Sequence, residues 1–202
     1  MTRLIIIILI TIPNATLSQT FDLGLIGGIN TSQVSGDGLG GFNKLGIRIG
    51  GLIKKEFSQF NAQIELQYIN KGSSTIAIRN SSNHSYIDSY TLRLNYIEVP
   101  ITIEKRIYKH MYLQTGVSIG QLVHMSELSN NYEVNGIKIN NTEYSVNLGV
   151  HTKLKNNIFL NTRLSHSIFP IRPHSSGQTY KWNRGQYNTS ISIALNYIIK
   201  RK

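Results

Sequence analysis

The sequence predicts an all-β protein, an eight-stranded antiparallel up-and-down transmembrane β-barrel. Apolar and polar residues alternate with period two along eight segments, and the links between these segments are alternately short and long. Period-two alternation is typical of strands whose two faces meet different surroundings. The composition agrees, because 17 Gly and 11 Tyr against 4 Pro favour strands and turns over helices.

The alternation is clearest in residues 61–68, 144–154 and 190–199. In residues 61–68, for example, Ile64 and Leu66 alternate with Gln63 and Glu65. Weaker versions occupy about 20–30, 44–54, 91–104, 111–123 and 158–169. Each segment is close to the roughly 9 to 11 residues that a tilted membrane strand requires.

The lengths of the links predict how the barrel is oriented. Links near 55–59, 105–110 and 155–157 are short, whereas those near 31–42, 70–90, 124–142 and 170–187 are long. Outer-membrane barrels have short periplasmic turns and longer external loops. With an even number of strands, both mature termini are therefore expected in the periplasm.

A soluble lipocalin-like barrel also alternates, but it turns its apolar face inward. The polar face decides between the two barrels, because it is lined with glycines and carries few charges. These glycines are Gly24, Gly28, Gly46, Gly50, Gly116, Gly120 and Gly149. Such a face suits the cramped interior of eight strands, so the membrane barrel is favoured.

The first residues predict export. A short basic start, an apolar run over residues 4–12 and small residues up to Ser18 are typical of a secretory signal peptide. We therefore expect a signal peptide at 1–18 and the outer-membrane barrel domain at 19–202. Cysteine is absent, which excludes disulfides, a thiol nucleophile and a lipidated cysteine anchor.

The formal charge of +11 raises the possibility of nucleic-acid binding. The basic residues are scattered, however, whereas a nucleic-acid binder concentrates them on one face. Dispersed positive charge suits contact with anionic lipid headgroups, and we expect outer-membrane lipids and lipopolysaccharide as partners, with no nucleic acid.

Charged residues on the polar face predict a network in the lumen. Arg48, Glu65, Glu98 and Arg163 fall near mid-height of four strands, and His151 shares their face. Buried charges must pair, so we interpret the set as a salt-bridge plug in which Glu98 pairs with Arg48 or Arg163. A selective narrow pathway is the functional alternative, and a hydrolytic carboxylate pair is the least favoured.

Motifs for chemistry are missing from the sequence. The six histidines lack metal-ligand spacing, and the sequence contains neither a nucleophile elbow nor a phosphate-binding loop. We expect no catalytic residue, no metal, no cofactor and no enzymatic activity.

The last long loop is a candidate external recognition surface, because it places the only Trp among basic residues. Its candidate residues are Arg172, Lys181, Trp182 and Arg184.

Four local patterns carry a family resemblance: GGINTS at 27–32, ELQYINKG at 65–72, LNYIEVP at 94–100 and YLQTGVSIG at 112–120. With them the chain resembles the outer-membrane β-barrel family of Bacteroidetes-type bacteria, a porin-like group that includes PorT-type proteins. The resemblance implies an eight-stranded barrel, and its PorT-type members are associated with type IX secretion.

The sequence as a whole predicts a non-catalytic integral outer-membrane protein, structural or accessory to an envelope or secretion assembly, with an envelope or secretion protein as a candidate partner. The alternatives are a narrow passive porin-like channel and a soluble periplasmic lipocalin-like binding barrel.

Overall fold

The computed structural model describes residues 21–75, 89–130, 132–134, 138–174 and 184–199. The predicted signal peptide at 1–18, together with Lys181 and Trp182, lies outside the described residues. Within the described part of the chain, no helix is long and apolar enough to cross a membrane.

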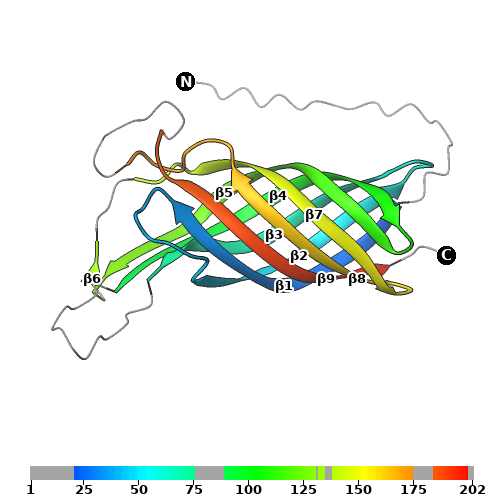
Figure 1. Ribbon diagram of the computed structural model, residues 1–202, viewed down its shortest axis with the longest axis horizontal. Coiled ribbons are helices and arrows are strands. Elements are labelled where there is room, and N and C mark those ends of the chain that lie inside the picture. Colours follow the sequence, from blue (N-terminus) through cyan, green and yellow to red (C-terminus); the bar gives the residue numbers. More distant parts are fainter. Residues whose placement is uncertain (1–20, 76–88, 131, 135–137, 175–183, 200–202) are drawn as a thin grey trace, which may run out of the picture.

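The described chain is built from β-strands joined by turns and loops (Figure 1). The strands are β1 (Phe21–Ser35), β2 (Lys44–Glu56), β3 (Asn61–Ser74), β4 (Tyr90–Tyr108), β5 (Met111–Ser129), β6 (Tyr132–Glu133), β7 (Thr142–Lys155), β8 (Ile158–Ser167) and β9 (Tyr187–Ile199).

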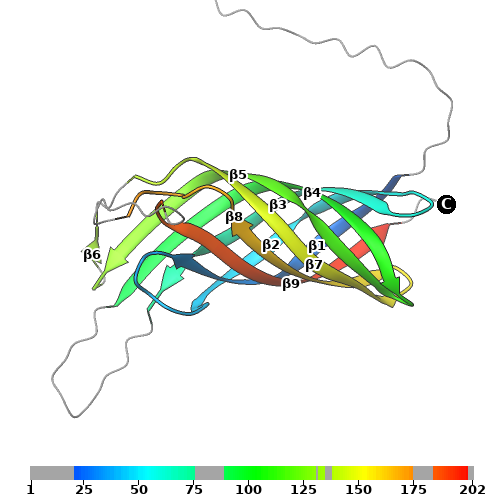
Figure 2. The same ribbon diagram turned by 45° about the horizontal axis from the view of Figure 1, so that its top comes forward.

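Eight of these strands close into a barrel, as predicted. The order around the wall is β4-β3-β2-β1-β9-β8-β7-β5, and pairing of β4 with β5 completes the circle. Every pairing is antiparallel, and the first strand meets the last in a register from Leu23↔Ile199 to Ser35↔Tyr187. The two-residue β6 pairs only with the last residues of β5, at its long-loop end. Figure 2 shows the same closed wall from a second direction.

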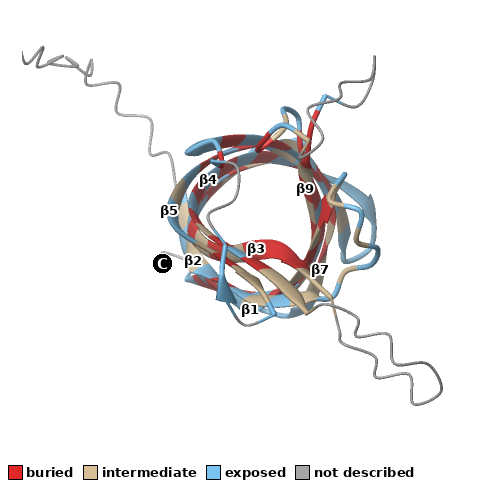
Figure 3. Cartoon of the chain, turned by 90° about the vertical axis from the view of Figure 1, so that its left-hand side faces the viewer, coloured by how far each residue is buried: buried red, intermediate tan, exposed pale blue. Residues whose placement is uncertain are grey.

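Apolar side chains cover the outside of the barrel, and polar side chains fill its inside. On β7, Leu148 is 53% exposed, whereas its neighbour Asn147 is 5% exposed. Seen end-on in Figure 3, buried and exposed residues alternate along the strands around the wall. The lipocalin-like arrangement, with apolar residues inside, is therefore wrong for most of the barrel.

The inward glycines create the space that the other inward side chains occupy. A Cβ atom at Gly28 would lie 2.5 Å from the Ala194 Cα atom, and one at Gly50 would lie 2.8 Å from the Gln67 Cα atom. Gly72 also adopts a φ of +133°, which L side chains rarely adopt. Glycine is thus needed at these places because neighbouring strands approach too closely for a side chain.

Strands β1, β3 and β5 extend further toward the long loops than the sequence predicts. β4 and β5 each have 19 residues, about twice what a tilted membrane strand needs. At the long-loop end of β4 the pattern is inverted, since Leu92 and Leu94 are buried inside while Arg93 is exposed outside. Apolar-in and polar-out is the arrangement of a strand surrounded by water, so this part of the wall rises beyond the apolar band.

Candidate functional site

Charged side chains inside the barrel form three layers, which we call the lumen network. From the short-turn end to the long-loop end, the layers are Lys54–Glu104–His151, then Arg48–Glu65–Arg163, and then Lys71–Glu98–Glu143. The network holds four basic side chains, two Arg and two Lys, and four carboxylates, so its formal charge is balanced when His151 is neutral.

The middle layer joins opposite walls of the barrel. Glu65 on β3 accepts hydrogen bonds from Arg48 on β2, at 2.9 Å, and from both terminal nitrogens of Arg163 on β8. Arg48 also donates to the Asn161 Oδ1 atom at 2.8 Å and to the Ser192 hydroxyl at 3.0 Å. The structure thus brings together three of the five predicted lumen residues.

The partner of Glu98 differs from the prediction. Glu98 forms an ion pair with Lys71, and its Oε2 atom accepts a 2.9 Å hydrogen bond from Gln67. Lys71 also pairs with Glu143 at 2.7 Å, which links β3 to β7. The predicted pairing of Glu98 with Arg48 or Arg163 is therefore wrong, because β3 supplies a closer cation. Sequence reasoning missed Lys71, although it shares the parity of Glu65 along β3.

His151 lies in the layer nearest the short turns. Its Nδ1 atom lies 2.6 Å from the Glu104 Oε1 atom, and Lys54 contacts the other oxygen of Glu104 at 2.8 Å. The Lys54 ammonium also lies 5.3 Å from the ring centroid of Phe159. Sequence reasoning missed Lys54 and Glu104, although strand parity places both inside: Lys54 with Arg48 on β2, and Glu104 with Glu98 on β4.

Apolar clusters flank the lumen network at both ends. Near the short turns the cluster consists of Ile26, Leu52, Phe159, Ala194 and Ile198. Near the long loops the cluster consists of Val34, Ile69, Leu92, Leu94, Tyr96, Ile139 and Ile171. Ile139 and Ile171 come from the loops before β7 and after β8, so these loops fold over the barrel mouth and place apolar side chains inside it.

Arg172 was predicted as an exposed recognition residue, but it is only 6% exposed. Its guanidinium donates to Glu127 at 2.8 Å and to the Tyr90 hydroxyl at 3.0 Å. Its backbone forms a bridge with Gln186, which turns the side chain into the rim. The prediction for Arg172 is therefore corrected, whereas Arg184 is exposed as expected.

The contacts of Arg172 also shift acid–base equilibria at the rim, beyond the apolar band. Burial raises the pKa of the Glu127 carboxyl, but hydrogen bonds from Arg172 and Tyr90 outweigh burial and leave that pKa below its ordinary value. Burial and the hydrogen bond to Glu127 raise the pKa of Tyr90 to about 12. At neutral pH Glu127 is therefore charged and holds Arg172 in place.

The lumen network is suited to holding strands together. Both oxygens of Glu65 and both oxygens of Glu104 contact basic side chains, which leaves neither carboxylate poised as a general base. Among the residues that the structure describes, no three His, Cys, Asp or Glu side chains gather as a metal site.

A closed wall with an apolar exterior and a charge-balanced interior defines an integral membrane β-barrel. The family model described as "Outer membrane protein beta-barrel domain" matches residues 16–172. The chain belongs to this family of outer-membrane barrels. No curated protein sequence matches the chain significantly.

Solved structures share the architecture at low sequence identity. A major outer membrane protein from Thermus thermophilus has a TM-score of 0.50 at 10% identity, and the match covers 89% of this chain and 99% of that one. Ail, the attachment invasion locus protein of Yersinia pestis, has a TM-score of 0.48 at 11% identity, covering 90% of this chain and 99% of its own. At such identities the likeness to the Thermus protein supports the fold alone.

Proposed function

We propose that this outer-membrane barrel is non-catalytic and closed, and that it serves as a structural component or accessory of an envelope or secretion assembly. The observation that carries the proposal is the lumen network, whose ion pairs join opposite walls. A conducting path would have to break these pairs, and breaking a buried pair by removing one partner costs about 3 to 5 kcal/mol. The apolar clusters at both ends add two further barriers to ions.

Planar-bilayer recording tests closure against the narrow-channel alternative. The purified barrel should give no steady conductance. Heat-modifiable migration of the barrel recovered from the same lipid confirms that the recorded sample is folded and inserted. Steady conductance through the unaltered barrel would contradict the proposal that the barrel is closed.

The proposal includes an orientation, with the long loops outside the cell and both mature termini in the periplasm after export by the signal peptide. It is supported by the short turns, which outer-membrane barrels place in the periplasm. A tag inserted after Ser129, at the long-loop end of β5, should be labelled on intact cells, whereas a tag after Lys202 should not. Reversed labelling would show that the barrel has the opposite orientation in the membrane.

The accessory role in secretion is supported by the resemblance to PorT-type proteins in the first half of the chain. Crosslinking in cells followed by purification of a tagged barrel tests it. Recovery of one stoichiometric envelope protein would support an assembly role. Recovery of the barrel alone would leave the structural role as the better account.

Lipid contact is a further part of the proposal, supported at the short-turn rim by a cation placed over two exposed aromatic rings. The Lys55 ammonium lies 4.9 Å from the Phe57 ring centroid and 5.5 Å from that of Phe21. Aromatic rings and long basic side chains anchor proteins at the membrane interface. This rim is thus suited to anionic phospholipid headgroups.

A further inference from the structure

We propose that a hollow on the outer side of the long-loop rim binds the phosphorylated sugar headgroup of lipopolysaccharide in the outer leaflet. The proposal deepens the lipid contact proposed above and rests on the long loops facing outward. It concerns the rim and is independent of whether the lumen is closed.

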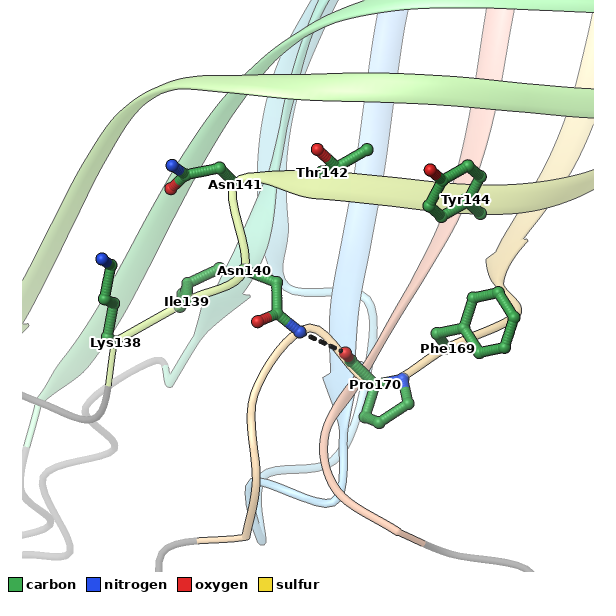
Figure 4. A pocket seen from close by; sticks show the side chains of 8 residues that line it. All are labelled: Lys138, Ile139, Asn140, Asn141, Thr142, Tyr144, Phe169 and Pro170. Carbon is green, nitrogen blue, oxygen red and sulfur yellow. Dashed lines mark hydrogen bonds between the residues drawn. The ribbon is translucent and has the colours of Figure 1, made fainter.

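The hollow has a volume of about 660 Å³, within the range of about 300 to 1,000 Å³ that is usual for ligand sites. It lies between the loop before β7, the first residues of β7 and the loop after β8 (Figure 4). The lining residues are Lys138, Ile139, Asn140, Asn141, Thr142, Tyr144, Phe169 and Pro170.

The height of the hollow on the barrel identifies the occupant as a lipid of the leaflet. Tyr144 lies on the outward face of β7, and Val146 and Leu148 follow it on the same face, in the apolar band. On β8 and β9, the next two strands around the wall, the rings of His166 and Tyr187 stack with centroids 5.9 Å apart. Outer-membrane barrels carry aromatic girdles where the hydrocarbon ends, so the hollow opens at the headgroup level.

The lining of the hollow combines an aromatic platform with polar groups. The Tyr144 and Phe169 rings meet edge to face at 6.0 Å, and the two residues are 44% and 61% exposed. The exposed Lys138 supplies a cation for phosphate, while Asn141 and Thr142 supply an amide and a hydroxyl for sugar hydroxyls. A phospholipid headgroup offers phosphate but no phosphorylated sugar ring, which makes the glycolipid the better match.

The walls of the hollow are held in place by the barrel. The Leu122 amide donates to the Asn141 carbonyl at 2.7 Å, the Asn140 amide donates to the Ile171 carbonyl at 2.7 Å, and the Asn140 side chain donates to the Pro170 carbonyl at 3.0 Å. The Ile139 side chain is buried in the apolar cluster at the mouth. A preformed site avoids the entropy of ordering loops on binding, which favours affinity.

Native mass spectrometry of the detergent-solubilised barrel tests the proposal with three probes: bisphosphorylated lipid A, dephosphorylated lipid A and phosphatidylglycerol. The unaltered barrel should retain bisphosphorylated lipid A in preference to both others. Lys138→Gln should weaken that binding about fivefold, as expected for the loss of one partly solvated ion pair. Tyr144→Ala combined with Phe169→Ala should weaken binding of both forms of lipid A.

Lys109→Gln is the matched control, because Lys109 is an exposed lysine beside an aromatic ring, Tyr108, at the opposite rim. Its lipid A binding should equal that of the unaltered barrel, and heat-modifiable migration should show that all variants fold. Three outcomes would each overturn the proposal. They are equal weakening of lipid A binding by Lys109→Gln and Lys138→Gln, binding of phosphatidylglycerol as tight as that of lipid A, and no retention of lipid A. None of these outcomes bears on the conductance test.

Discussion

Two adjacent glycines show how much a single residue position can matter in this barrel. Gly27 and Gly28 follow one another on β1 and therefore point to opposite faces. A Cβ atom at Gly28 would lie 2.3 Å from the Ile193 carbonyl oxygen, whereas a Cβ atom at Gly27 would have no atom within 4 Å. The inward glycine thus sets the distance between β1 and β9, and the outward one leaves open space.

Gly28→Ala should destabilise the barrel by about 1 to 3 kcal/mol or block folding, because β9 would have to shift to relieve the overpacking. Gly27→Ala is the matched control and should change stability by no more than about 0.5 kcal/mol, as is usual for surface substitutions. Urea unfolding of the refolded barrels in lipid vesicles measures both. Equal effects at the two positions would contradict the assignment of faces.

Glu98 shows what the sequence reveals about a charged residue and what it does not. Strand parity predicted that Glu98 lies inside, and the structure buries it there. Its partner could not be predicted, because that contact depends on the register between β3 and β4, which the alternation within each strand leaves open. Lys71 reaches Glu98 from β3 because β3 and β4 are neighbours, and their register places Gln67 opposite Glu98.

A double-mutant cycle tests the new pairing. Glu98→Gln should cost about 3 kcal/mol, near the lower end of the range for a broken buried pair, because Lys71 keeps its contact with Glu143. Glu98→Gln and Lys71→Gln should couple, within the range of about 0.5 to 3 kcal/mol that contacting residues show. The parallel cycle with Arg163→Gln is the control and should give much weaker coupling. Stronger coupling of Glu98 with Arg163 than with Lys71 would support the pairing predicted from the sequence.

At the scale of one strand, the burial pattern along β4 shows where the apolar band ends. Outward residues are apolar from Ile97 to Ile103, and beyond them the outward residues are Asn95 and Arg93 while Leu92 and Leu94 turn inward. The sequence shows this change, since apolar residues switch from even to odd numbers between Tyr96 and Ile97. The predicted strand began at 91, but the inverted part could not be distinguished from ordinary alternation without knowing which face meets lipid.

Leu148→Arg tests the apolar band on β7. An arginine at the middle of the hydrocarbon costs roughly 2 to 4 kcal/mol in such barrels, falling to about 0 to 1 near the interfaces. Thr152→Arg, on the same face of β7 but nearer its short-turn end, should therefore be tolerated. Folding into lipid vesicles, followed by heat-modifiable migration, compares the two. Normal assembly of Leu148→Arg would mean that this face does not meet lipid.

For the molecule as a whole, the sequence predicted the wall but not the closure of its mouth. Periodicity and link lengths predict strands and their antiparallel order, because both follow from local pattern. The loops before β7 and after β8 have no such pattern, yet they bury Ile139 and Ile171 and place Arg172 against Glu127. Their placement depends on tertiary contacts with the rim, which is why the sequence alone predicts an exposed Arg172.

The Glu127–Arg172 contact should make the closed mouth sensitive to acid. The pKa of Glu127 is lower in the folded protein than its unfolded value of about 4.3, because hydrogen bonds from Arg172 and Tyr90 outweigh the effect of burial. Its contribution to stability is therefore fully present above pH 4.3 or so and is lost as the pH falls through the folded pKa.

Hydrogen exchange measures this closure at two amides of the mouth, Asn140, which donates to Ile171, and Ile171, which donates to Gln186. After correction for intrinsic rates, their protection should fall below about pH 4, as Glu127 becomes protonated and its hold on Arg172 weakens. The Lys153 amide, bonded to the His110 carbonyl at the other end of the barrel, is the internal control and should stay protected.

In Glu127→Gln the protection of the mouth should be lower at neutral pH and should no longer change as the pH falls. Acid-dependent opening that persists in Glu127→Gln would mean that another group holds the mouth closed.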